Sequence, residues 1–423
     1  MSNKDDNDDN KESLVPAQPA ALSRAGAASL ATRGLHELSQ RGITWRHAHV
    51  NLEDWMGLDP LALAISSRGL VASNRRSGSE SIHAIAILDV TTGEQVTIKS
   101  PAFDLSGRPD AMLLGNSCIV ENVAEGFSWS PCGRYLLTRS REYSRPVRLY
   151  DGCKKEFLGV IGHEPDCNSI TWSPDGKWLA TGASCCDWPP LAIWHIEQIE
   201  TCSLEKRVEL DIGEWFSGTS WFFSRDEYRG ASFNLFDGFY AAAFNSHSTV
   251  VALSAINRLE FPREVAPRDE DQEESTGEEV DRLSVYSVVG FDVPSLHQKF
   301  RTEVPAYVES LAWSQQGRLV ICSSSQVAVV EPNSSKLLAL PFQGDICLCH
   351  PNHEWCAFAS RRWPWDVVNG DDRLVIADLT DFNEISEQRI TGGIYDMAWS
   401  SDGHALLAIS SKGEFWECDF GAF

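Results

Sequence analysis

A short phrase recurs along this chain and constrains its fold more than any other feature. The phrase is an aromatic or apolar residue, then Ser-Pro-Asp-Gly or a variant of it, then an apolar run, and its clearest copies span residues 127–138 and 170–181. Proline presets φ at about −65°, and glycine accepts the positive φ that a tight turn needs. Each copy therefore predicts two antiparallel strands and the turn that joins them.

Weaker copies of the phrase lie at residues 62–73, 243–252, 311–320, 348–357 and 397–406. Most copies are followed by a third alternating strand, for example at residues 144–151, 191–194, 282–286 and 373–378. A weaker fourth strand usually comes next. Seven such units predict an all-β fold, a seven-bladed β-propeller of four-stranded antiparallel blades.

One unit carries a more specific motif, because Gly162-His163 opens it and Trp194-His195 closes it. This unit resembles a WD repeat, in which the closing pair is Trp-Asp, and the chain is similar to divergent WD40-repeat (WD-like) propellers. In that family a buried network joins a His, a Ser or Thr of the second strand, an Asp of the next turn and the Trp. The resemblance implies a structural blade network of His163, Thr181, Asp187 and Trp194. TolB-like periplasmic propellers share the phrase Asp-Gly-Lys-x-Leu-Ala, and the sequence leaves that relation open.

Composition divides the chain into three parts. Residues 1–16 are polar and acidic and predict a disordered tail. In residues 17–43 apolar side chains recur at steps of three and four, which predicts a helical segment that packs on the propeller or recruits a partner helix. Residues 44–423 are expected to form the propeller. Their first strand, residues 44–52, is expected to supply the fourth strand of the last blade and close the ring.

Acidic residues exceed basic residues, and the formal net charge is −24. Direct nucleic-acid binding needs a surplus of Lys and Arg, so we expect none. Residues 264–281 hold nine acidic residues and one Arg and predict a disordered acidic insertion in blade four. This insertion is either a solubilising loop or a regulatory segment that folds over the neighbouring loops when no partner is present.

No run of about 18 apolar residues occurs, and the chain opens on Met1-Ser2-Asn3-Lys4-Asp5-Asp6 in place of a basic and apolar signal. We therefore expect a cytoplasmic protein without membrane contact. The twelve cysteines are scattered without the spacing of a disulfide framework, which is typical of reduced apolar residues.

The densest group of possible metal ligands is Cys347, Cys349, His350, His353 and Cys356. Thiolates and imidazoles suit Zn²⁺, but the repeat places these residues at ordinary hairpin positions, where core packing explains them. The sequence contains no nucleophile elbow, P-loop, dinucleotide fingerprint or His-Glu-x-x-His motif. We expect no catalytic residue, metal or cofactor. The alternative is a propeller enzyme, hydrolytic or small-molecule-binding, with its site at the mouth of the central channel.

The loops that join the second and third strands of the blades emerge on one face of a propeller. In this chain they are rich in Arg, Trp and Tyr, which are enriched at binding hot spots. The candidate partner-binding residues are Arg75, Arg76, Arg141, Tyr143, Arg145, Trp188, Arg258, Phe261, Arg263, Arg361, Arg362, Trp363 and Trp365.

A ring of arginines on an acidic protein predicts a site for a protein partner or for an acidic or phosphorylated peptide. The alternative is that the tryptophans pack on blade edges and the arginines pair with nearby acids such as Asp366, Asp371 and Asp372. We interpret the chain as a non-catalytic protein-interaction scaffold or adaptor that uses this loop face.

Overall fold

The chain is all-β in the residues that the computed structural model describes. These are residues 38–40, 43–49, 63–77, 82–99, 103–104, 119–120, 126–139, 147–161, 167–183, 191–201, 203–209, 232–262, 280–323, 325–331, 336–360, 371–391, 393–410 and 413–421. They contain one short 3-10 helix, η2 (Ile199–Thr201). No helix in this part of the chain is long and apolar enough to cross a membrane.

The strands form six four-stranded sheets and one five-stranded sheet, which confirms the predicted seven-bladed propeller. Blade one contains β3 (Leu63–Ile65), β4 (Leu70–Ser77), β5 (Ile82–Asp89) and β6 (Gln95–Lys99). Blade two contains β9 (Gly126–Trp129), β10 (Tyr135–Arg139), β11 (Val147–Asp151) and β12 (Glu156–Ile161). Blade three contains β13 (Cys167–Trp172), β14 (Trp178–Ala183), β15 (Leu191–Gln198) and β16 (Ser203–Glu209).

Blade four contains β17 (Ser232–Phe244), β18 (Val250–Pro262), β19 (Val280–Asp292) and β20 (Gln298–Val304). Blade five contains β21 (Val308–Trp313), β22 (Leu319–Ser323), β23 (Val327–Glu331) and β24 (Lys336–Ala339). Blade six contains β25 (Ile346–Cys349), β26 (Trp355–Ala359), β27 (Asp371–Asp378) and β28 (Glu384–Thr391).

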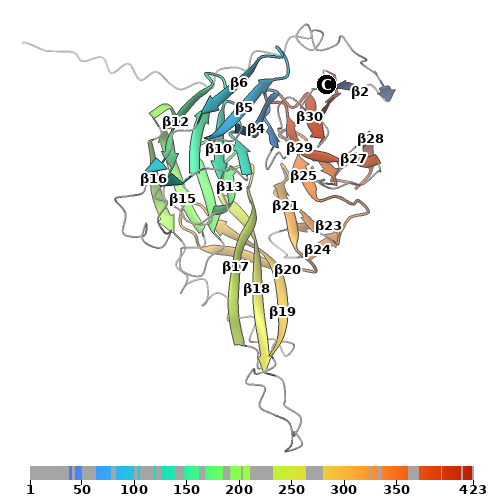
Figure 1. The fold of residues 1–423 in the computed structure, drawn as a ribbon. Helices are drawn as coiled ribbons and strands as arrows, with labels where there is room; N and C mark the ends of the chain where they lie inside the picture. The colour runs from blue at the N-terminus through green and yellow to red at the C-terminus, as the bar shows by residue number, and fades with distance from the viewer. Residues whose placement is uncertain are drawn as a thin grey trace, which may run out of the picture.

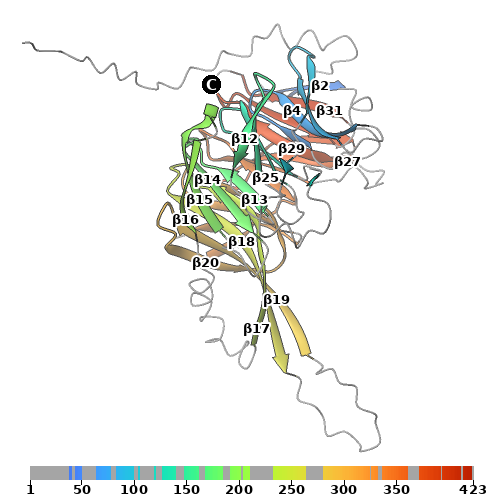
Figure 2. The same ribbon diagram turned by 60° about the vertical axis from the view of Figure 1, so that its left-hand side comes forward.

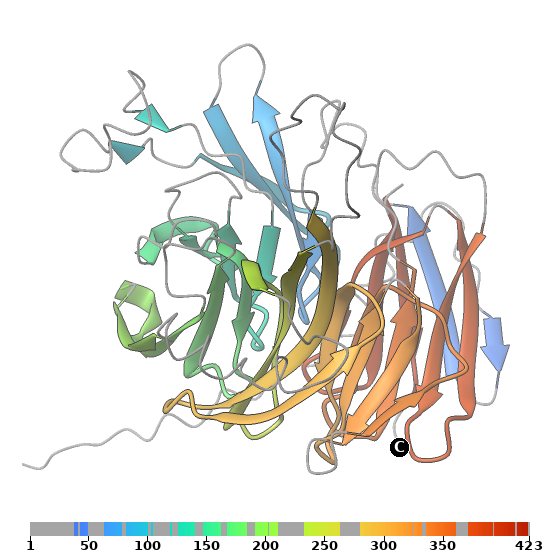
Figure 3. The same ribbon diagram turned by 90° about the horizontal axis from the view of Figure 1, so that it is seen from below.

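Blade seven contains β29 (Ile394–Trp399), β30 (Ala405–Ser410) and β31 (Glu414–Asp419) together with β2 (Ile43–His49) and β1 (Leu38–Gln40). A separate pair, β7 (Phe103–Asp104) and β8 (Ile119–Val120), lies between blades one and two in the sequence. The blades follow chain order around the molecule, so that red blade seven returns beside blue blade one (Figures 1 and 3).

The repeated phrase forms the turn between the first and second strands of a blade, and its serine holds that turn. In blade three the Ser173 Oγ accepts a hydrogen bond from the Trp178 N–H at 2.8 Å. Gly176 adopts φ of 70°, which an L side chain rarely takes. In blade four Asn245 replaces the serine, and its Oδ1 accepts from the Thr249 N–H at 2.8 Å. The phrase therefore tolerates substitutions that keep a short side-chain acceptor at this position.

In four blades the tryptophan in front of the turn joins the blade to the one before it. Its indole N–H donates to a carbonyl on the first strand of the preceding blade, in the pairs Trp129–Ala64 at 3.3 Å, Trp172–Ser128 at 3.2 Å, Trp313–Ala243 at 3.0 Å and Trp399–Leu348 at 3.1 Å. The other three blades carry Ile65, Phe244 or Cys349 at this position and have no indole donor. The repeated aromatic residue thus sets the position of one blade against the next.

The apolar core is distributed over the junctions between blades. Each of seven clusters of buried apolar side chains combines residues from two neighbouring blades. Ile87 of blade one, for example, packs with Leu136 and Tyr150 of blade two, and all three are buried. The ring is therefore held by contacts between successive sheets, as propellers require.

Strand β2 pairs with β31 in antiparallel register from Thr44↔Asp419 to His49↔Glu414. The two ends of the described chain therefore share one sheet, where the sequence places a closing strand. The sequence predicts a helix over residues 17–43, but the last part of this segment is a strand. Leu38–Gln40 forms β1, which pairs with β2. Antiparallel pairing with β2 supplies hydrogen-bond partners to backbone groups of β1, which explains why a strand forms here. The remainder of the predicted helix and the predicted tail, residues 1–16, lie outside the described residues.

Blade four differs from the others because three of its strands extend beyond the ring. Strands β17, β18 and β19 each have 13 residues, and their outer parts project from the body as an arm (Figures 1 and 2). We call residues 232–237, 257–262 and 280–285 the blade-four arm. Strand β19 begins at Val280, so Val280 and Asp281 at the end of the predicted acidic insertion belong to a strand. The rest of that insertion lies outside the described residues.

Candidate partner interface

Four of the thirteen candidate partner-binding residues fall on described strands. Arg75 and Arg76 lie near the end of β4, where they pair with Ala84 and His83 of β5. Arg258 and Phe261 lie in the blade-four arm, on β18. The other candidates, Arg141, Tyr143, Arg145, Trp188, Arg263, Arg361, Arg362, Trp363 and Trp365, lie outside the described residues. The structure thus brings the candidates together in two pairs, and the ring as a whole stays a prediction.

The blade-four arm is a three-stranded sheet with two different edges. Strands β18 and β19 pair without a register shift from Val250↔Asp292 to Pro262↔Val280. Strand β17, on the other side of β18, has register shifts at Phe233/Leu235, Phe236/Gly238 and Phe239/Ala242. Such bulges bend and twist a strand, which makes it a poor template for another chain. The regular edge of the arm is therefore that of β19.

Strand β20 covers the outer edge of β19 only where β19 lies in the ring. Their ladder runs from Phe291↔Gln298 to Tyr286↔Val304 and ends there. Pro305 comes next in the chain, and proline has no N–H to continue the ladder. Within the described residues no strand pairs with β19 from Val280 to Val285 on this side.

The sequence contained signals for the arm that the predictions did not use. Residues 258–261, Arg-Leu-Glu-Phe, alternate polar and apolar side chains as a strand does. Residues 233–240 hold four aromatic residues, which favour strands. The acidic composition that follows Pro262 hid this pattern, because it is typical of a loop.

The predicted blade network is placed in part. The Trp194 Nε1–H donates to the Thr181 Oγ1 at 3.0 Å, and both side chains are buried in blade three. His163 and Asp187 lie outside the described residues. The hydrogen bond satisfies two buried polar groups inside one blade, which is a structural task.

A second recurring residue was missed from the sequence, an aspartate at the end of the third strand. Its Oδ1 accepts a backbone N–H from the following turn, in the pairs Asp89–Thr91 at 2.8 Å, Asp151–Cys153 at 3.0 Å and Asp378–Thr380 at 2.7 Å. This aspartate stands where a WD repeat has the Asp of Trp-Asp. Its recurrence at the end of the third strand in blades one, two and six was the signal that could have revealed it.

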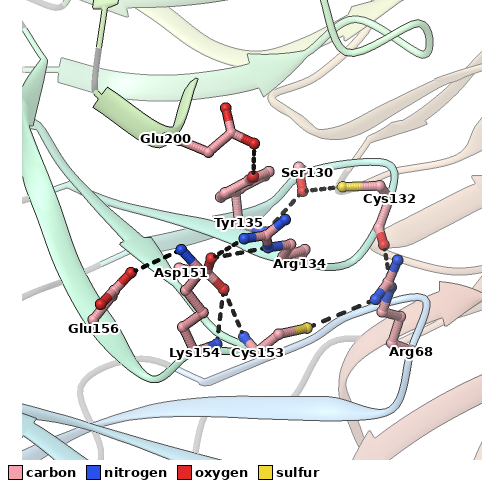
Figure 4. A network of polar contacts seen from close by, with 10 residues as sticks. All are labelled: Arg68, Ser130, Cys132, Arg134, Tyr135, Asp151, Cys153, Lys154, Glu156 and Glu200. Atoms are coloured by element: carbon pink, nitrogen blue, oxygen red, sulfur yellow. Dashed lines mark hydrogen bonds and ion pairs between the residues drawn. The ribbon is translucent and has the colours of Figure 1, made fainter. Parts of the chain in front are cut away.

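The face opposite the loop face is built from turns, and its polar side chains bind one another (Figure 4). The Arg134 Nε and Nη2 donate to one oxygen of Asp151, at 2.8 and 2.6 Å. Burial pushes the pKa of Asp151 upward, but hydrogen bonds from Arg134 and from the backbone N–H groups of Lys154 and Cys153 hold that pKa below its usual range. The carboxylate therefore stays ionised and fixes the turn.

The same network ties blade two to both of its neighbours. The Arg68 Nε of blade one donates to the Cys132 carbonyl at 2.6 Å, and the Tyr135 Oη donates to the Glu200 Oε1 of blade three at 2.8 Å (Figure 4). Burial and this hydrogen bond raise the pKa of Tyr135. Because the cations here are already matched to acceptors, we assign this cluster to holding the blades together.

The cysteine and histidine group of blade six is engaged in core packing and turn formation. The His350 Nδ1 accepts the N–H groups of Asn352 and His353, each at 2.9 Å, and the Nε2 lies 2.8 Å from the Gly403 carbonyl of blade seven. Both ring nitrogens are therefore used, and burial lowers the pKa of His350 to about 4. Burial also raises the pKa of the Cys356 thiol, which disfavours the thiolate that a metal needs. Among the described residues no group of three or more His, Cys, Asp or Glu side chains could hold a metal ion.

Comparison with known proteins agrees with this architecture. Residues 154–188 match the family model of the WD domain, G-beta repeat, over part of the unit that carries the closing Trp194-His195. Among curated protein sequences, none matches this chain.

Two solved structures share the fold at low sequence identity. One is described as "Crystal Structure of Mitotic Checkpoint Complex", with a TM-score of 0.51 and 12% identity over 86% of this chain and 92% of that chain. The other is the β-propeller domain of Cps50 (Swd1) from Myceliophteria thermophila, with a TM-score of 0.50 and 11% identity over 85% of this chain and 96% of that chain. Together with the sheet order, these findings identify the fold and its repeat. The chain is a seven-bladed β-propeller that contains a WD40 repeat.

Proposed function

We propose that this propeller is a non-catalytic scaffold that binds a protein partner on the face where the second and third strands of the blades are joined. The observation that carries the proposal is the blade-four arm, which extends β18 and β19 beyond the ring on this side of blade four. Among the described residues, none of the seven buried clusters between blades includes a residue of the arm. We therefore infer that the arm is a surface that binds another molecule.

Two further points support a scaffold. WD40 propellers generally act as protein-interaction scaffolds and are generally non-catalytic. One of the similar structures is named as a protein complex. The candidate residues on the loop face favour an anionic partner, an acidic or phosphorylated segment, because guanidinium groups bind carboxylates and phosphates in pairs. We expect this binding to take place in the cytoplasm.

Affinity purification from native extract tests the proposal. Wild type is compared with a triple variant, Arg361→Glu, Arg362→Glu and Trp363→Ala, on the loop face. Arg389→Glu on β28 serves as the matched control, because Arg389 is an exposed arginine of the same blade that lies outside the candidate set. We expect a stoichiometric protein that accompanies wild type and the control and is lost in the triple variant. The same partners in all three proteins, or none, would reject the loop face as the docking surface.

A further inference from the structure

The outer edge of β19 in the blade-four arm has no strand beside it in the described part of the chain. Residues Val280 to Val285 pair with β18 on one side only, and the β20 ladder stops at Tyr286↔Val304. Figures 1 and 2 show β19 at the border of the arm with no labelled strand beyond it. Alternate residues of such an edge direct their N–H and C=O groups outward, where another strand can pair with them.

Natural sheets usually protect an edge of this kind, and the two edges of this arm differ in that respect. The register shifts of β17 interrupt its edge, whereas β19 pairs with β18 without a shift over its whole length. A continuous edge is the template that a docking strand needs in β-augmentation. Within the ring, β20 pairs with this same side of β19. In the described residues the outer edge of β19 from Val280 to Val285 is therefore a direct continuation of a side that already accepts a strand.

Charge selects the kind of strand that fits this edge. The sequence that joins β18 to β19, residues 263–279, contains eight acidic residues and two arginines. The formal charge of the whole chain is −24. Pairing the arms of two copies would place like charges close together, which opposes a homodimer. The edge itself carries one acidic and one basic residue, Asp281 and Arg282, so the surplus of acidic residues that precedes it in the sequence is what favours a segment with Lys or Arg.

We propose that the outer edge of β19, from Val280 to Val285, binds an extended basic segment of a protein partner as an additional β-strand. The inference rests on the proposed scaffold function and adds the chemistry of one contact. The ligand proposed for the β19 edge has the opposite charge to the ligand expected at the other arginine-rich candidates, although Arg258 lies on β18 of the same arm. A partner with neighbouring acidic and basic segments would use both.

The test uses the full chain and a short peptide of alternating Lys and Val. Controls are a peptide of alternating Glu and Val and a Lys-Val peptide methylated on alternate backbone nitrogens. We expect the Lys-Val peptide to slow hydrogen–deuterium exchange at residues 280–285 and to bind at least about tenfold more tightly than either control. Equal binding of the three peptides, or protection confined to other strands, would overturn the proposal.

Two proline variants supply a control within the strand itself. Leu283→Pro and Ser284→Pro remove adjacent N–H groups, of which one points toward β18 and the other outward. The variant that keeps exchange protection across β18 and β19 should lose binding of the Lys-Val peptide by about tenfold or more. Unchanged peptide binding in that variant would refute docking at this edge. If both variants lose exchange protection across β18 and β19, the comparison with the methylated peptide still tests docking at this edge, because it uses the unaltered protein.

The two proposals fail in different ways. Suppose that a native partner still binds the proline variant that lacks the outward N–H but no longer binds the variant with Arg361→Glu, Arg362→Glu and Trp363→Ala. That result would overturn the β19 proposal and leave the scaffold proposal standing. The absence of any partner on wild type would reject the scaffold, while the peptide experiment would still report on the edge.

Discussion

Blade five and blade four are neighbours in one ring, yet their first three strands differ in length by more than a factor of two. Strands β22 and β23 of blade five have 5 residues each and are buried almost throughout. Strands β17, β18 and β19 of blade four have 13 residues each. Over the shared inner part the two blades are alike, because Val320 and Ile321 in one and Leu253 and Val289 in the other are buried at blade junctions.

The comparison shows that the ring requires buried apolar residues in the inner part of each blade but does not fix the length of the strands. Among the described residues, the buried clusters at the two junctions of blade four contain no residue of the blade-four arm. Strand β20, at the outside of blade four, has 7 residues and stops where the ring part of β19 ends. Ring positions should therefore govern stability, and arm positions should govern binding. Five measurements test this distinction.

The largest effect is expected at Phe291, a buried ring position of β19. Phe291→Ala should lower the free energy of unfolding by about 3–5 kcal/mol, because it leaves a cavity between blades three and four. Urea unfolding measures this loss. A change below about 1 kcal/mol would mean that blade four is not packed into the ring as blade five is.

A pH-dependent effect is expected at His350, which takes the place of the turn serine in blade six. Its pKa is lowered from 6.5 to about 4, so the unfolded chain binds the proton more tightly than the folded protein. Stability should therefore be complete above the unfolded pKa and should fall by on the order of 2 kcal/mol as the pH drops from about 6.5 to about 4.

His350→Ser restores the repeat residue and should remove this part of the pH dependence. Unfolding curves of both proteins across the same pH range give the comparison. Parallel pH dependence in wild type and variant would show that another group is responsible.

Asp151→Asn should cost roughly 1–3 kcal/mol at neutral pH. The substitution keeps an acceptor for the turn but removes the charge that pairs with Arg134 at 2.6 Å. Because the folded pKa of Asp151 is depressed, the ion pair contributes above the unfolded pKa and is lost as the pH falls through the lower folded value. The stabilities of the two proteins should therefore converge in acid. A constant difference at every pH would contradict the ion pair.

Trp313→Phe tests the indole bridge between blades four and five, where the Nε1–H donates to the Ala243 carbonyl at 3.0 Å. Blade four itself has Phe244 at the equivalent position, so a phenyl ring fits this site. We expect a loss of about 0.5–1.5 kcal/mol, the contribution of one hydrogen bond. Thermal unfolding of the variant and of wild type is sufficient to measure it. An unchanged stability would show that this hydrogen bond does not help to hold blades four and five together.

The smallest effect on stability is expected in the arm. Arg258→Ala should change the free energy of unfolding by less than about 0.5 kcal/mol, because its position on β18 lies beyond the ring. Co-purification of a partner is the readout on which this variant should differ from wild type. A large loss of stability would show that the arm supports the ring.

The sequence predicted the ring well because the ring is repetitive. Each turn needs the same few residues, so Ser173, Asn245 and Ser400 can be aligned although the strands around them differ. The same logic fails for the arm, which occurs once and has nothing to be aligned with. In β17 the register shifts also interrupt the alternation that marks a strand.

The candidate site was predicted less completely, for a physical reason. Turns are specified by local backbone conformations that Gly, Pro, Ser and Asp produce. The residues that we predict to bind a partner, such as Arg361 and Trp363, follow no such rule, because recognition of a partner does not require a particular backbone turn. The edge of β19 was invisible for another reason, since an unpaired backbone has no residue signature of its own.

The pairing of β2 with β31 has a consequence for how the protein is made. His49 and its partner Glu414 are roughly 365 residues apart in the sequence, and at about 5–20 residues per second a ribosome needs roughly 20–70 s to cover that interval. Throughout that time the first strand of the ring is present without its mate. Strand β2 is thus synthesised before the seven blades and pairs with the last of them, and its exposed edge can meet either β31 of its own chain or a neighbouring chain.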